Sequence, residues 1–239
     1  MGVITWNGVA STSVNIQVEH QPHYNIAERD YEYIHVPGRN GDFLIDSGGW
    51  KNVKQSYDIC FIDFDLLDFF HAAHRVASWL SSAPGYAVLK DTYDPLYYRL
   101  ATFDSNQKLT DLLGQAGRAT IEFNCKPQRF LLSGDDAISI STSGSSVTNP
   151  LDMPSRPLIT VYGTGAGTLH VGSYEVIFDS ISESVTVDSE VEDCYKAGST
   201  VSNAVTLTDG YPILGVGNTG IEFSGGITHV DVVPKWWTL

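Results

Sequence analysis

Hydrophobic and polar positions alternate along much of the first half of the chain, a pattern typical of β-strands with one buried face. Residues 13–19 set Val14, Ile16 and Val18 against polar neighbours. In residues 53–61, every second residue lies on one face, which carries Val53, Gln55, Tyr57, Ile59 and Phe61. The pattern predicts strands over residues 13–19, 31–36, 43–45, 53–61, 86–90, 97–103 and 118–125.

Turn-forming residues separate these strands. Residues 37–42 form a dense turn cluster that contains Asn40-Gly41, and Asn-Gly between two extended runs is a strong hairpin signal. A second turn is predicted at Ser47-Gly48-Gly49. We therefore expect a β-hairpin with its tip at residues 37–42.

One segment follows a helical period instead. Between residues 65 and 82, apolar side chains recur at steps of three and four positions, which gives a helix one apolar stripe. The carboxylates of Asp63, Asp65 and Asp68 crowd its beginning, where they suit free amides and the helix dipole. We predict a single α-helix over about 65–82, followed by a break at Pro84.

The second half shows only short β-type runs. A polar, serine-rich stretch at 133–149 predicts a linker between domains over residues 1–132 and 150–239. Seven runs without a helical period favour a β-sandwich or jelly roll in the second domain. The predicted strands of this half are 158–162, 168–171, 174–178, 184–187, 204–207, 220–223 and 227–233.

The charge is unevenly distributed along the chain, whose net charge is −14. Residues 1–132 carry 11 basic and 15 acidic side chains, a balance of −4, whereas residues 133–239 carry 3 and 13, a balance of −10. No cluster of Lys and Arg suits nucleic-acid phosphates, so we expect no sequence-specific nucleic-acid binding. No apolar run approaches the roughly 20 residues that span a bilayer, so we expect no membrane insertion.

Several groups resemble chemical sites, but a plainer interpretation is favoured for each. His71 and His74 lack further metal ligands in a suitable pattern, and we expect helix-surface histidines. The glycines of 163–168 lack the lysine and following helix of a phosphate loop, so we predict a hairpin turn there. The acidic residues of 188–193 could serve a glycosidase or bind calcium, but such a loop is usually solvated.

Two further groups complete the candidates. Trp236 and Trp237 could stack on sugar in a lectin-like sandwich, although paired tryptophans near a terminus more often lock a strand end into a core. The three cysteines are far apart and odd in number, and we expect buried free thiols at Cys60, Cys125 and Cys194. We predict no catalytic residue, no metal and no cofactor.

Several segments, taken in order, resemble one family. The run from Tyr33 to Phe43, which ends in HVPGRNGDF, resembles the hairpin of phage distal tail (Dit) proteins of long-tailed, siphovirus-type bacteriophages. Residues 49–53 resemble the strand entry that follows in that family, and 117–130 the sequence that closes its first domain. Segments near 149–163, 188–190 and 234–239 follow the C-terminal pattern, with Lys235 where an arginine is expected.

The resemblance implies a mostly β protein that is not an enzyme. Its N-terminal domain would be β-barrel-like with one helix and would join six copies into a ring, and its C-terminal domain would be a galectin-like sandwich. The ring would connect the tail tube to the tail-associated (Tal) protein in the virion tail tip, after assembly in the host cytoplasm. A receptor-binding protein is a further candidate partner.

The interface residues are also predicted from this resemblance. We take Arg39, Asn40 and Gly41 at the hairpin tip, with Trp50 and Lys51 at the following strand, as candidate contacts to a second subunit or to the tail tube. An alternative function is a carbohydrate-binding module that recognises a receptor. At 239 residues there is no room for an inserted carbohydrate-binding module, so we expect the compact form of the family.

Overall fold

The computed structural model describes residues 1–61, 69–103 and 118–239, and the chain divides into two compact units. Unit 1 comprises Met1–Arg129 with Leu239, and unit 2 comprises Phe130–Thr238. The predicted linker at 133–149 is wrong, because β10 (Ile138–Ile140) and β11 (Ser145–Asn149) both pair with a long strand of unit 2. All but one of its serines are exposed, the exception being half-buried Ser145, which explains the misleading composition.

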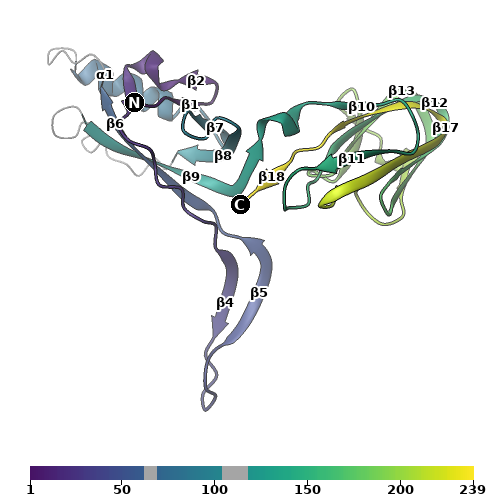
Figure 1. The fold of residues 1–239 in the computed structure, drawn as a ribbon, viewed down its shortest axis with the longest axis horizontal. Coiled ribbons are helices and arrows are strands. Elements are labelled where there is room, and N and C mark those ends of the chain that lie inside the picture. The colour runs from purple at the N-terminus through teal and green to yellow at the C-terminus, as the bar shows by residue number, and fades with distance from the viewer. Residues whose placement is uncertain (62–68, 104–117) are drawn as a thin grey trace. The chain divides into compact units, whose positions relative to one another are not determined.

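Unit 1 is built on a curled, half-barrel sheet with strand order β2-β1-β7-β8-β9-β6-β3 (Figure 1). The strands of this sheet are β1 (Ile4–Trp6), β2 (Val9–Ala10), β3 (Ile16–Val18), β6 (Val53–Phe61), β7 (Ala87–Asp91), β8 (Tyr97–Phe103) and β9 (Arg118–Leu131). Every second residue at the start of β6 is buried, as the alternation predicts. The strand predictions at 53–61 and 97–103 are confirmed to the residue.

The helix α1 (Phe69–Leu80) supplies part of the unit 1 core. Val76 and Leu80 are buried against the sheet residues, and the indole Nε1 of Trp6 donates to the Leu80 carbonyl over 3.1 Å. The indole of Trp79 donates likewise to the carbonyl of Val9. The predicted helix is therefore present, whereas its predicted beginning, with Asp63, Asp65 and Asp68, lies outside the described residues.

The strand predicted at 13–19 is shorter than expected. A 3₁₀ turn, η1 (Ser11–Val14), comes first, and β3 begins only at Ile16. Between them Asn15 has φ 61°, a left-handed conformation that asparagine tolerates better than most residues. Val14, Ile16 and Val18 are nevertheless all buried, so the predicted burial is confirmed although the local backbone differs.

Unit 2 consists mainly of three long antiparallel strands. These are β12 (Leu158–Val171), β13 (Tyr174–Asp188) and β17 (Gly217–Val233), and β12 pairs with both others along its length. The remaining elements are the 3₁₀ turns η2 (Leu132–Asp135) and η3 (Ser202–Ala204) and the strands β14 (Asp193–Lys196), β15 (Ser199–Thr200), β16 (Val205–Leu207) and β18 (Trp237–Thr238).

The long strands fold over a glycine-rich crease to form a sandwich. Ile159 in the first half of β12 and Leu169 in the second half are both fully buried in one core. Between them the register of β12 shifts near Gly163 and Gly167. The hairpin turn predicted at 163–168 is therefore wrong, because these residues lie inside one strand and let it bend.

Candidate assembly interface

The hairpin predicted around residue 40 forms a separate two-stranded sheet. Strands β4 (Arg29–Ile34) and β5 (Phe43–Trp50) pair with each other and not with the main sheet of unit 1. Figure 1 shows the two strands extending away from the body of this unit. The turn predicted at Ser47-Gly48-Gly49 is wrong, because these residues lie within β5, where Gly48 has φ 78°.

Both faces of the hairpin are apolar and exposed. Tyr33 lies opposite Leu44, and Ile34 lies opposite Phe43, so the antiparallel register puts these two pairs on opposite faces. Tyr33 is 66% exposed, Phe43 48% and Leu44 47%. Ile45 joins the face of Phe43 and is also exposed. We call Tyr33, Ile34, Phe43, Leu44 and Ile45 the apolar ribbon.

Three of the five sequence-predicted interface residues lie at the hairpin tip. Arg39, Asn40 and Gly41 are exposed, and the guanidinium carbon of Arg39 lies 6.0 Å from the centre of the Phe43 ring. Gly41 has φ 80°, a left-handed conformation that suits glycine in this turn. The tip is thus an exposed turn beside the apolar ribbon.

The other two predicted residues lie at the base of the hairpin. The ring of Trp50 is half-buried beneath the guanidinium of Arg29, which lies 4.3 Å from the ring centre. Lys51 is exposed, and its backbone N–H donates to the carbonyl of Glu28 over 2.8 Å. The five residues therefore form two separate groups at opposite ends of the hairpin.

Sequence reasoning missed the apolar ribbon between these groups. Its signal is the unbroken run Phe43-Leu44-Ile45, since consecutive strand residues point to opposite faces. Three apolar residues in succession therefore make both faces apolar, which fits either a fully covered strand or an assembly surface.

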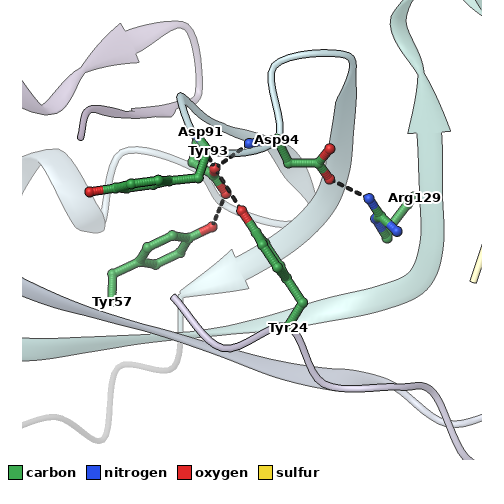
Figure 2. Close-up of polar contacts among 6 residues, drawn as sticks. All are labelled: Tyr24, Tyr57, Asp91, Tyr93, Asp94 and Arg129. Atoms are coloured by element: carbon green, nitrogen blue, oxygen red, sulfur yellow. Dashed lines mark hydrogen bonds and ion pairs between the residues drawn. The ribbon is translucent and has the colours of Figure 1, made fainter. Parts of the chain in front are cut away.

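A polar cluster anchors the chain that leads into the hairpin (Figure 2). The carboxylate of Asp91, at the end of β7, accepts hydrogen bonds from the Tyr24 hydroxyl over 2.9 Å and from the Tyr57 hydroxyl over 2.8 Å. It also accepts from the backbone N–H groups of Tyr93 and Asp94. Four donors thus converge on one carboxylate.

The environment of the two phenols keeps them protonated. Burial raises the pKa of Tyr24, and the hydrogen bond to the Asp91 carboxylate raises it further. Burial raises the pKa of Tyr57 well above its ordinary value, and the charge of Asp91 adds to this effect. Nearby, Arg129 pairs with Asp94 at 2.6 Å. The arrangement is a set of structural hydrogen bonds around one anion.

The residues of the candidate metal and acidic sites are exposed to solvent or bound to other groups of the protein. His71 and His74 are exposed on α1, and among the described residues no group of three or more His, Cys, Asp or Glu side chains is placed to hold a metal ion. In the acidic loop, Asp188 accepts from two backbone N–H groups, and Glu192 pairs with Arg156 at 2.9 Å. Asp193 accepts from nearby hydroxyls, which lower its pKa.

The tryptophan pair does not form an exposed sugar platform. Trp236 is 4% exposed and belongs to the unit 2 core, and the indole of Trp237 donates to the Pro154 carbonyl. A hollow of about 190 Å³ lies elsewhere on unit 2, lined by His170 and Glu222 beside two glycines. It is smaller than the roughly 300–1,000 Å³ usual for ligand pockets.

The cysteines are free, and two of the three are buried. Burial raises the pKa of Cys125 to about 12 and that of Cys194 to about 11. Cys60 is only half-buried, so the prediction of a buried thiol is wrong at this position. It lies on β6, next to the last residue of that strand.

No helix in the described part of the chain is long and apolar enough to cross a membrane.

Comparison with solved structures finds this architecture in a phage hub protein. No family model matches the chain, and no curated protein matches it. The Dit protein of phage SPP1, described as a paradigm of the hub adsorption apparatus in phages infecting Gram-positive bacteria, matches with a TM-score of 0.77 and 13% identity over 100% of both chains. The phage p2 baseplate, in its activated conformation with Sr, is a weaker likeness, with a TM-score of 0.48 and 9% identity over 97% of this chain and 96% of the other. The chain therefore shares the fold of SPP1 Dit over its whole length, as the sequence resemblance implies.

Proposed function

We propose that this chain is a structural, non-enzymatic hub of a bacteriophage tail tip, in which copies of the chain associate into a ring of six. The ring joins the tail tube to a tail-associated protein in the virion, and a receptor-binding protein is a further candidate partner. The observation that carries this proposal is the likeness to SPP1 Dit over the full length of both chains, at a TM-score of 0.77. Assembly takes place in the cytoplasm of the bacterial host.

The apolar ribbon supports self-assembly. An isolated two-stranded hairpin is at best marginally stable in water, because it buries too little apolar surface. Here the hairpin exposes apolar side chains on both faces, from Tyr33 and Leu44 on one side and Phe43 on the other. Contact with a neighbouring copy would cover these side chains and stabilise the hairpin, with Arg39, Asn40 and Gly41 at the far edge of that contact.

The charge distribution agrees with this assignment. Copies that meet through surfaces of large like charge repel one another, and residues 1–132, which include the hairpin, have a balance of only −4. Residues 133–239 carry −10, which favours exposure to solvent. We therefore assign the ring contacts to unit 1 and the solvent-exposed role to unit 2.

The native mass of the full-length chain tests the proposal. We expect a species of six times the 26.1 kDa of one chain by native mass spectrometry and light scattering. Phe43→Ser and Ile45→Ser should reduce this species strongly while the circular dichroism spectrum of the chain is retained. The matched control is Leu96→Ser, which alters a 64% exposed apolar residue of unit 1 outside the hairpin and should leave the ring intact.

One result would overturn the proposal, and a second would overturn the part of it that places the hairpin in the interface. The first is a wild-type chain that stays monomeric at every concentration and touches no other copy in a purified tail. The second is ring formation that Phe43→Ser and Leu96→Ser impair equally, which would remove the hairpin from the interface. Binding of the monomeric full-length chain to a cell-wall glycan array would instead favour the alternative, a saccharide-recognition module.

A further inference from the structure

The chain between β3 and β4 is an irregular strap, residues 19–28, which lies along β6. The backbone N–H of Glu19 donates to Asp58, and the amide side chain of Gln55 donates to the carbonyl of His23 over 3.1 Å. Beyond these contacts, the side-chain amide of Asn25 donates to the Lys54 carbonyl over 2.8 Å. All three contacts join the strap to one strand, β6.

Two strap contacts reach other strands: Glu19, at the start of the strap, pairs with Arg118 of β9 over 2.7 Å, and Tyr24, in its middle, reaches β7. The hydroxyl of Tyr24 bonds to Asp91 at the end of β7, and the sheet order places β8 and β9 between β7 and β6. The hydroxyl of Tyr57, on β6 itself, bonds to the same carboxylate. Figure 2 shows both phenols converging on Asp91 from separate segments. Tyr24 thus links the strap to β7, on the other side of the curled sheet from β6.

The strap leads directly into the first strand of the hairpin. The hairpin is connected to the rest of unit 1 by two chain segments, one from the strap into β4 and one from β5 into β6. A hydrogen bond from the Lys51 N–H to the Glu28 carbonyl joins the two segments at the hairpin base. Lys51 and Asn52 lie outside any strand, so the second segment can bend there. The first segment is held in place by the strap.

We propose that Tyr24 and Asp91 form a clasp that fixes the direction of the β4–β5 hairpin and thereby controls self-assembly; the assembly part rests on the proposed function. Tyr24 acts as a positioning residue, because its own contact is with Asp91 and its effect is on the apolar ribbon. Opening the clasp leaves the ribbon intact but lets it swing about its base.

A pair of matched phenylalanine variants tests the clasp. Tyr24→Phe and Tyr57→Phe each remove one hydroxyl hydrogen bond to Asp91, but only the first removes a contact between the strap and β7. We expect Tyr24→Phe to accelerate hydrogen exchange of the Lys51 amide and of the β4–β5 ladder by about tenfold or more relative to β9. Tyr57→Phe should not change this ratio. By native mass spectrometry, Tyr24→Phe should lower the ring fraction more than Tyr57→Phe does.

The outcomes separate the clasp from the proposed function. Equal exchange ratios in the two variants, or no change in either, would overturn the clasp. Accelerated exchange with an unchanged ring fraction would overturn its control of assembly. If the wild-type chain forms no ring, the proposed function fails, while the exchange ratio still decides whether Tyr24 fixes the hairpin. Exchange of β9 amides and the far-ultraviolet circular dichroism report whether either variant unfolds.

Discussion

Alanine at the crease of unit 2 should destabilise the sandwich strongly. A Cβ atom at Gly226 would lie less than 3 Å from the Thr164 carbonyl oxygen, and one at Gly163 would lie less than 3 Å from the Gly226 carbonyl oxygen. Both obstructing atoms are backbone, so they cannot rotate away as the end of a flexible side chain could. The strands must therefore move apart if either glycine gains a side chain.

The size of the effect follows from this crowding. Overpacking a well-packed site costs about 1–3 kcal/mol, and the rigid backbone on both sides places Gly226→Ala and Gly163→Ala at about 2–3 kcal/mol. For a domain of about 100 residues this loss lowers the Tm of unit 2 by roughly 10–20 °C. Gly220→Ala is the matched control on the same strand, because nothing lies within 4 Å of a Cβ atom there.

Differential scanning calorimetry of the full-length chain measures the shift. Hydrogen exchange of β12 and β17 amides should show that the destabilisation lies in unit 2. We expect Gly220→Ala to change stability by no more than about 0.5 kcal/mol. If the three variants have the same Tm, the bend in the long strands does not depend on close approach of their backbones at the crease.

Three further predictions concern titration, thiol reactivity and the core. The raised pKa values of Tyr24 and Tyr57 give stability that is fully present below their ordinary value of 10.0 and is lost as pH rises above it. The Tyr24→Phe/Tyr57→Phe double variant should therefore show a shallower fall in urea stability between about pH 10 and 12. Ellman's reagent should modify half-buried Cys60 in the native chain well before Cys125, whose pKa is raised to about 12; equal rates would contradict the burial pattern. Trp236→Ala should destabilise unit 2 by about 3–5 kcal/mol in calorimetry, because the indole lies in its core, whereas a platform for sugar would tolerate the change.

Local periodicity predicted the strands whose environment is regular along their length. In β6 the sheet buries one face from Val53 onward, so the sequence alternates and the bounds are correct. The same reasoning divided β12 into two short strands, because Gly163, Gly165 and Gly167 resemble a turn in sequence. A bend inside a strand and a turn between strands both require glycine, and only the pairing partner distinguishes them.

The clasp could not have been predicted in this way. Tyr24 and Asp91 are 67 positions apart, and neither lies in a motif that implies the other. Tyrosine and aspartate are common at strand ends and turns, so the sequence carries no sign of their hydrogen bond. The hairpin tip was predicted because Asn40-Gly41 is a local signal, whereas the direction of the hairpin depends on this long-range contact.

The distribution of exposed apolar side chains favours a hairpin that is completed by assembly. Among the described residues, six of the fourteen large apolar side chains that are exposed lie between Tyr33 and Ile45. Scattered apolar side chains are normal on any surface, but a concentration on both faces of one hairpin is typical of an interaction site. Because such a hairpin gains little stability from its own contacts, it should be among the least protected strands of the isolated chain in hydrogen exchange. Burial of both faces in the ring would supply the missing stability, and the hairpin would then become protected only when copies associate.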